Sequence, residues 1–176
     1  MLIRKVDDET ELHLLERKHA GELEALDPGD LTFSQGEWIG VKGRVDAWMS
    51  QALGDFAAGT RLEAGIFRNG LLIGIVSLQD IDRDGKSAGL NYALDGKWRG
   101  RGIMTRCCRA LIAYAYEELD LNRIEIVADV GNIPSCRIPE KIGFAKESVM
   151  RACYRSADGF RDCARYSLLK SEWKGG

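Results

Sequence analysis

The sequence has little of what marks a membrane-spanning or metal-binding protein. Its longest unbroken apolar run, around Leu71–Val76, is far too short to cross a bilayer. The 5 cysteines include no Cys-x-x-Cys pair and the 2 histidines form no cluster, so we expect no metal site. A formal charge of -2 over 176 residues gives no reason to expect attraction to nucleic acid or to a membrane surface.

Other absences concern the compartment and the domain organisation. Met1–Lys5 is followed at once by the acids of Asp7–Glu9 instead of the apolar core of a signal peptide, so we expect a cytoplasmic protein. Internal repeats, low-complexity segments and long linkers are absent, which predicts a single domain that takes in all 176 residues. In a reducing compartment we expect free thiols, even where a hairpin through Ser156–Gly159 would bring Cys153 close to Cys163.

One stretch combines glycine, positive charge and the start of a helix. Gly100 and Gly102 stand one residue apart, and apolar residues recur at helical spacing over Ile103–Glu118. A helix start exposes unpaired N–H groups and the positive end of the helix dipole, and glycine lets a phosphate approach closely. No acid falls within residues 96–110, and the stretch is therefore predicted to bind a polyphosphorylated ligand. The cations around the glycines are Lys97, Arg99, Arg101, Arg106 and Arg109.

Several interpretations of the glycine pair compete. A P-loop would need Gly-x-x-x-x-Gly-Lys-Ser/Thr, which the chain lacks. A dinucleotide fingerprint would need a small residue in place of Thr105 and a strand running straight into Gly100, but the hydrophilic residues 95–99 intervene. A solvated basic turn that caps a core helix is the simplest alternative. The spacing Lys97-x-x-Gly100-x-Gly102 resembles the acetyl-CoA pyrophosphate loop of the GNAT superfamily, Gln/Arg-x-x-Gly-x-Gly/Ala, with lysine in the first position.

The hydrophobic pattern predicts an α/β fold in which helices cover a mixed sheet. Asn69-Gly70 between two apolar runs is the strongest hairpin signal, and Asp27–Gly29 ends the first helix. Helices are expected over Arg17–Leu26, Gly43–Ala58, Ile103–Glu118 and a short stretch after Asn132. Strands are expected over Glu11–Leu15, Arg61–Phe67, Leu71–Leu78, Ser87–Leu94, Arg123–Asp129, Glu147–Tyr154 and Phe160–Leu169, with a polar turn over Asp80–Lys86.

Several motifs in the right order extend the resemblance beyond the loop. They are similar to the ribosomal-protein N-terminal acetyltransferases within the GNAT superfamily, from Glu11 to Trp173 and most closely between Ala88 and Phe144. The segments concerned are Gly100–Thr105, Leu121–Glu125, Asn132-x-x-Ser135, Glu140–Phe144 and Tyr166–Leu169. The resemblance implies a mostly antiparallel sheet of about seven strands flanked by four helices. It also implies that the central strands Ser87–Leu94 and Arg123–Asp129 splay apart.

In that superfamily acetyl-CoA lies in the gap between the splayed strands. The resemblance implies that backbone groups at the end of Ser87–Leu94 bond the pantetheine arm, that Asn132 bonds it from the other side, and that amides of Arg99–Met104 hold the pyrophosphate. The expected acetyl-CoA residues are Tyr92, Ala93, Leu94, Lys97, Arg99, Gly100, Arg101, Gly102, Ile103, Met104, Asn132 and Ser135. Asn132 and Ser135 also suit an Asx turn and a helix N-cap, and the two roles are compatible.

The reaction that the resemblance implies is direct attack of a neutral amine on the thioester carbonyl, with no acyl-enzyme. Catalysis would depend on holding the reactants together and on N–H donors aimed at the developing oxyanion. Ser135 is expected to place its hydroxyl near the leaving sulfur. An α-amine with a pKa of about 7.7–8.0 is partly neutral at pH 7, whereas a lysine near 10.4 costs roughly 3.5 kcal/mol more to deprotonate. A weak base therefore suffices for a protein N-terminus.

A few positions depart from the related enzymes. Those enzymes commonly carry a glutamate directly before the tyrosine that ends the sixth strand, where this chain has Cys153 before Tyr154. Asn91 and Ala93 also differ from the glycine and the aromatic residue that usually flank the position of Tyr92. The resemblance therefore leaves the general base and the acceptor pocket open, and a non-catalytic acetyl-CoA-binding module is an alternative.

The acceptor is expected to be a primary amine, most simply the N-terminal α-amine of a protein such as a ribosomal protein. A polyamine, an amino sugar or an amino-acid derivative is the alternative. Asp7–Asp30 holds 9 acids and 2 cations, which suits either attraction of a cationic chain terminus or a solvated acidic face. Phe33 and Trp38 are candidates for the acceptor groove, although a core role suits such aromatic residues better. His13 and His19 are interpreted as structural, and the resemblance makes a homodimer an expectation.

Overall fold

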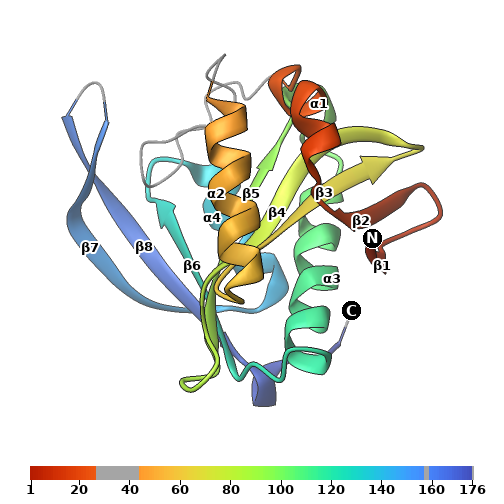
Figure 1. Ribbon diagram of the computed structural model, residues 1–176. Coiled ribbons are helices and arrows are strands. Elements are labelled where there is room, and N and C mark those ends of the chain that lie inside the picture. The colour runs from red at the N-terminus through yellow and green to blue at the C-terminus, as the bar shows by residue number, and fades with distance from the viewer. Residues whose placement is uncertain (27–43, 157–158, 176) are drawn as a thin grey trace.

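A computed structural model describes residues 1–26, 44–156 and 159–175. Within these residues an 8-stranded sheet runs in the order β1-β2-β3-β4-β5-β6-β8-β7 (Figure 1). Its strands are β1 (Leu2–Lys5), β2 (Thr10–Leu14), β3 (Leu62–Arg68), β4 (Leu71–Asp82), β5 (Ser87–Leu94), β6 (Arg123–Asp129), β7 (Ala145–Ser156) and β8 (Gly159–Leu169). The helices are α1 (Ala20–Glu24), α2 (Val45–Ala57), α3 (Ile103–Glu117) and α4 (Ile133–Ile142).

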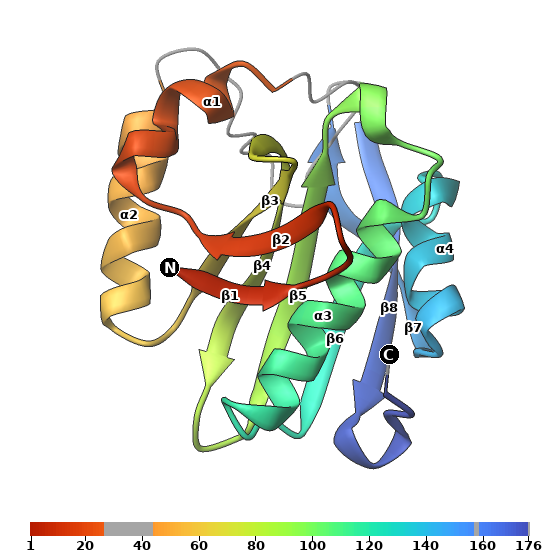
Figure 2. The same ribbon diagram turned by 90° about the vertical axis from the view of Figure 1, so that its right-hand side faces the viewer.

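Helices cover both faces of the sheet. Figure 2 shows α1 and α2 on one side and α3 and α4 on the other. The larger core cluster lies under α3, whose buried residues include Met104, Cys108, Leu111 and Ala115, as the predicted stripe requires. The smaller cluster joins α1 and α2 to the opposite face through Leu23, Val45, Met49, Leu72, Ile75 and Ala93. The chain therefore buries two apolar layers, one on each side of the central strands.

The central strands separate as the resemblance implied. Ser87, Ala88 and Gly89 of β5 pair in parallel with β6, and the last of these pairs is Gly89 with Glu125. From that point β5 pairs with β4 and β6 pairs with β8. The two strands diverge toward Leu94 and Asp129, while every other pairing in the described sheet is antiparallel. The predicted splay is confirmed.

Three details differ from the sequence-based expectation. The sheet has 8 strands instead of about seven, because Leu2–Lys5 forms a short edge strand against β2. The helix predicted over Arg17–Leu26 is divided, with a 3-10 turn at Arg17–His19 before α1. The predicted polar turn begins later, because β4 continues to Asp82 through an irregularity at which Asp80 has a φ of 50°.

Two further points bear on earlier expectations. Phe33 and Trp38, the predicted acceptor-groove residues, lie outside the described residues. None of the helices in the described segments is long and apolar enough to cross a membrane.

Candidate active site

The glycine loop enters α3 through backbone angles that favour glycine. Gly100 has a φ of +75° and Gly102 a φ of +71°, in the left-handed region that L side chains rarely adopt. Gly102 is the N-cap of α3 and, as a glycine, has no side chain with which to cap the first N–H groups of the helix. A Cβ on Gly100 would meet nothing within 4 Å, so the loop has open space in front of it. This arrangement fits a pyrophosphate that approaches the backbone at the start of a 15-residue helix.

Asp95 fixes the turn before the glycines. Its buried carboxylate accepts a hydrogen bond from the backbone amide of Lys97 at 2.9 Å and caps the 3-10 turn Gly96–Trp98. The guanidinium of Arg101 lies 5.2 Å from the centre of the Trp98 ring. Because both ends of the turn are held, the backbone amides that follow are preorganised.

The five predicted cations divide into two groups. Arg106 donates to a carboxylate oxygen of Asp7 at 3.1 Å, and Arg109 donates to the backbone carbonyl of Lys141 at 3.1 Å. These two arginines tie α3 to the N-terminal hairpin and to α4. Lys97, Arg99 and Arg101 lie exposed in the loop before the helix start, where Arg99 also donates to the backbone carbonyl of Leu94 at 3.3 Å.

Three predicted residues meet where β5 and β6 separate. The hydroxyl of Tyr92 lies 3.2 Å from the hydroxyl of Ser135 and donates to the Ser135 carbonyl at 3.1 Å. Burial raises the pKa of Tyr92 far above its ordinary value, so this phenol stays protonated at neutral pH. Asn132 caps α4 by accepting a hydrogen bond from the amide of Ser135 at 3.2 Å. The structure therefore brings Tyr92, Asn132 and Ser135 together, and Asn132 does serve as an N-cap.

Asp129 and Tyr154 form a second contact at the open end of the splay. The Tyr154 hydroxyl on β7 donates to Asp129 Oδ2 at 2.6 Å, and the amide of Gly131 donates to Oδ1 at 2.7 Å. The alternation of buried and half-buried residues in β6 was the signal that Asp129 faces away from the α3 core. The sequence alone did not predict this contact, since it depends on how far the β7–β8 hairpin extends past the end of β6.

Cys153, which stands where the related enzymes commonly have glutamate, lies next to a second cysteine. Both Cys153 and Cys163 are free thiols, the first exposed and the second buried. Burial, together with a side-chain hydrogen bond with Cys153, raises the pKa of Cys163 to about 12. The two cysteines are in contact, and a buried thiol with such a pKa is a poor proton acceptor.

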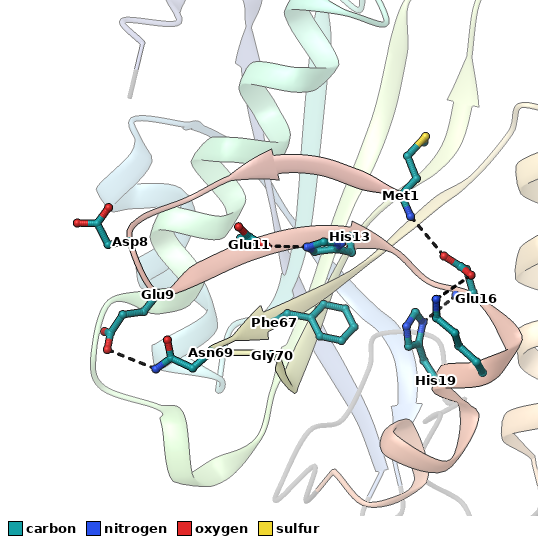
Figure 3. Close-up of a pocket in the computed structure, with 11 residues that line it drawn as sticks. Met1, Asp8, Glu9, Glu11, His13, Glu16, His19, Phe67, Asn69 and Gly70 are labelled. Atoms are coloured by element: carbon teal, nitrogen blue, oxygen red, sulfur yellow. Dashed lines mark hydrogen bonds and ion pairs between the residues drawn. The ribbon is translucent and has the colours of Figure 1, made fainter.

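Both histidines line a cavity of about 460 Å³ beside the N-terminal hairpin (Figure 3). His13 Nε2 lies 2.8 Å from Glu11, and His19 Nδ1 accepts a hydrogen bond from the backbone amide of Glu16 at 3.0 Å. The Phe67 ring contacts both imidazoles, with centroids 5.3 Å and 5.2 Å away. Burial lowers the pKa of His19. These contacts agree with a structural role for both histidines.

A second cavity, of about 360 Å³, lies between the end of α1, the start of β4 and the glycine loop. Glu22 of α1 and Lys97 and Arg101 of the loop all line it. Part of the acidic N-terminal quarter therefore borders the cations of the predicted cofactor site, while Asp27 and Asp30 lie outside the described residues.

Comparison with known proteins places this geometry in a family. The model of the acetyltransferase (GNAT) domain family matches residues 11–145. The chain belongs to the GNAT acetyltransferases. GNAT acetyltransferases use acetyl-CoA.

Individual relatives add detail. The chain is 43% identical over 114 residues to the Bacillus subtilis protein named "Putative ribosomal N-acetyltransferase YdaF", a match that covers 65% of this chain and 62% of that protein. It thus spans about three fifths of the length of that curated relative. A crystal structure described as a probable acetyltransferase is 34% identical, with a TM-score of 0.86 over 98% of this chain and 99% of the other. The RimL ribosomal L7/L12 alpha-N-protein acetyltransferase in complex with coenzyme A has a TM-score of 0.88 at 21% identity, over 98% and 99% of the two chains, and supports the fold.

Proposed function

We propose that this GNAT acetyltransferase transfers an acetyl group from acetyl-CoA to the N-terminal α-amine of a protein, such as a ribosomal protein. The part of this proposal that concerns acetyl-CoA rests on the geometry at the start of α3. Two glycines with positive φ deliver the chain into a helix whose first N–H groups are left for a ligand, beside three exposed cations.

The donor site extends from the loop into the splay. Amides of Arg99–Met104 would hold the pyrophosphate, and backbone groups near Tyr92, with Asn132 opposite, would bond the pantetheine arm. Acetyl-CoA supplies an activated thioester carbonyl as the acyl donor. Ser135 would face the same gap, and the contact of its hydroxyl with the Tyr92 hydroxyl at 3.2 Å helps to orient it. A hydroxyl held there can hydrogen-bond the leaving sulfur, whose thiol has a pKa of about 8.5 and needs only modest help.

The part of the proposal that concerns the acceptor amine rests on the pKa of that amine and on the names of the relatives. An α-amine with a pKa of about 7.7–8.0 is the primary amine that is easiest to use without a strong base. The relatives reported above include one named for ribosomal N-acetylation and one named for α-N acetylation of a ribosomal protein. The lower pKa of the α-amine and the names of these relatives both favour a protein N-terminus over a lysine side chain as the acceptor.

A thiol-release assay tests this function. The enzyme, acetyl-CoA and one acceptor are mixed, using peptides that begin with serine, alanine or methionine, an N-terminally blocked peptide with one lysine, and spermidine. We expect turnover with at least one free N-terminus and little with the blocked peptide. Turnover with spermidine alone would replace the proposal with a small-amine acetyltransferase, and turnover with none of the acceptors would refute both.

A further inference from the structure

A buried carboxylate on β3 has one oxygen with no partner. Glu63 is only 4% exposed, and its Oε2 atom has no hydrogen-bond partner in the described part of the chain. The other oxygen, Oε1, accepts from Arg61 Nε at 2.6 Å and from the Gln79 amide at 3.4 Å. A buried polar atom without a partner is costly, so a carboxylate kept in this state calls for a function.

The groups around Glu63 decide how readily it takes up a proton. Arg61 is the charged neighbour on its own strand, and it also reaches Asp55 of α2 at 3.6 Å and lies over the Trp48 ring. Burial raises the pKa of Glu63, while the Arg61 charge and hydrogen bonds from Arg61 and from Gln79 on β4 oppose the shift. The balance leaves a carboxyl group that accepts a proton at a higher pH than an exposed glutamate does.

The strand register leads from Glu63 to the splay. Glu63 pairs with Ser77 on β4, and Ser77 pairs with Asn91 on β5. Asn91 lies two residues beyond Gly89, where β5 has already left β6. Neighbouring strands lie roughly 4.8 Å apart, so the backbones of Glu63 and Asn91 are about 10 Å apart. One hydroxyl group and a short chain of water molecules can relay a proton over that distance.

The row of paired residues from Glu63 to Asn91 lies on the face of the sheet opposite Ser135. Asn91 lies on the same face of β5 as Ala93, which packs in the α2 cluster, whereas Tyr92 points to the other face and contacts Ser135 of α4. An acceptor that entered from the α2 face would therefore meet the thioester with Ser135 behind it and the Glu63 row beside it.

Other acids near the splay are already occupied. Glu125, at the last β5–β6 pair, is ion-paired with Arg123 at 2.7 Å. Asp129 uses one oxygen for the Tyr154 hydroxyl and the other for a backbone amide of its own turn. Glu63 is the acid in the described chain that combines burial with an unused oxygen.

We propose that Glu63 is the final proton acceptor for the acceptor amine, reached through the Ser77 hydroxyl and water along the Glu63–Ser77–Asn91 row. The amine arrives as an ammonium ion and gives one proton to Glu63 Oε2. Its lone pair then forms the C–N bond as the C–S bond breaks, the second proton of the nitrogen leaves with the thiol, and Glu63 returns its proton to solvent. This inference rests on the proposed function, and it gives the chain a base where Cys153 replaces the expected glutamate.

The test compares wild type with Glu63→Gln on the serine-initiated peptide at pH 6.5 and pH 9. At pH 6.5 most of the amine is protonated, so we expect kcat/KM of the variant to fall about 100-fold, mainly through kcat. At pH 9 the amine is already neutral, and the loss should shrink below about tenfold. The midpoint of the acid limb should move up to the pKa of the peptide amine, about 7.7–8.0.

Matched variants separate this role from a structural one. Glu147→Gln removes another ion-paired strand glutamate, on β7, and should keep the wild-type pH profile. Glu63→Asp keeps a carboxylate and should keep the acid limb at a reduced rate. An equal loss for Glu63→Gln at both pH values, or none, overturns the inference. Thermal unfolding of each variant shows whether the fold is intact.

A second readout does not depend on turnover. The Glu63 carboxyl carbon is followed by NMR in protein labelled with carbon-13, with and without coenzyme A and the serine-initiated peptide. We expect the pKa of Glu63 to fall when the peptide ammonium binds, because a nearby positive charge favours the carboxylate. An unmoved pKa with peptide bound overturns the inference. Peptide that binds without being acetylated refutes the proposed function instead, so the two failures are distinguishable.

Discussion

The hydroxyl groups of Tyr92 and Ser135 lie 3.2 Å apart and join β5 to α4 across the splay. Burial keeps the Tyr92 phenol protonated, so it is a lasting hydrogen-bond donor toward Ser135. Ser135 is also held from its backbone side, where its amide donates to Asn132. The hydroxyl that would face the leaving sulfur is thus oriented by two elements that meet only in the folded protein.

Removing the Tyr92 hydroxyl tests this link. Tyr92→Phe should lower kcat with little change in acetyl-CoA affinity, because the ring remains and only the contact to Ser135 is lost. The loss of a hydrogen bond should cost about 1 kcal/mol of folding stability. The measurement is a double-mutant cycle with Ser135→Ala in the thiol-release assay. Additive effects on kcat would show that the two hydroxyls act independently.

The conformation of Gly100 gives a prediction with an internal control. Gly100→Ala forces a side chain into φ +75°, which costs about 1–2 kcal/mol, and it also places a methyl group in the open space before the loop. Gly59→Ala meets the same backbone problem at φ +76°, also in open space, at the end of α2. Both variants should lose similar stability, but calorimetry should show weaker acetyl-CoA binding for Gly100→Ala alone. Equal affinities would argue against the loop as the pyrophosphate site.

The two roles of Asn132 are separable. Asn132→Ala removes the cap of α4 and should cost about 1 kcal/mol, whereas Asn132→Asp keeps an oxygen that accepts from Ser135. If Asn132 also bonds the pantetheine arm through its amide, the aspartate variant should be stable yet bind acetyl-CoA more weakly. Stability is measured by thermal unfolding and affinity by calorimetry. Wild-type affinity in the aspartate variant would confine Asn132 to capping.

An ion pair between Arg123 of β6 and Glu147 of the edge strand β7 predicts how the stability of the fold depends on pH in acid. The guanidinium of Arg123 donates to Glu147 at 3.0 Å and 2.7 Å, Ser167 donates at 2.7 Å, and together these bonds lower the pKa of Glu147 to about 2. A carboxylate whose pKa is lowered in the folded protein stabilises the fold at pH values above 4.5, its ordinary pKa. This contribution disappears as the pH falls toward 2.

Thermal unfolding of wild type and Glu147→Gln checks this pair. The wild type should have the higher Tm at pH 6, and the difference should narrow steadily below pH 4.5. High salt should narrow it as well, because the pair is partly exposed. A Tm difference that stayed constant from pH 6 to pH 3 would mean that the charge of Glu147 contributes nothing.

Much of the fold follows from local pattern. The bounds predicted for Ser87–Leu94 and Arg123–Asp129 match β5 and β6, because turn residues and alternating burial mark both ends. The start of α3 at Ile103 was fixed by the glycines before it. Short or edge elements were harder: β1 has four residues and exists through its pairing with β2, which no local pattern encodes.

The candidate site was predictable where one segment builds it and obscure where distant segments meet. Within the loop from Lys97 to Met104, the residues alone predicted two glycines before a helix start, as the structure has them, and the pyrophosphate role of the loop stays a prediction. The contact of Tyr92 with Ser135 and that of Asp129 with Tyr154 depend on tertiary packing across the splay. Glu63 lies in a predicted strand, but its role could not be predicted from the sequence, because its burial and its unpartnered oxygen arise only when β4 and α2 pack around it.

The position of the transferred acetyl group tests the central claim most directly. The enzyme and acetyl-CoA are incubated with a peptide that carries both a free N-terminal serine and an internal lysine, and the product is sequenced by tandem mass spectrometry. The account predicts one acetyl group on the N-terminal nitrogen, formed in step with free thiol. Acetylation confined to the lysine, or a peptide that stays unmodified while spermidine is acetylated, would contradict it.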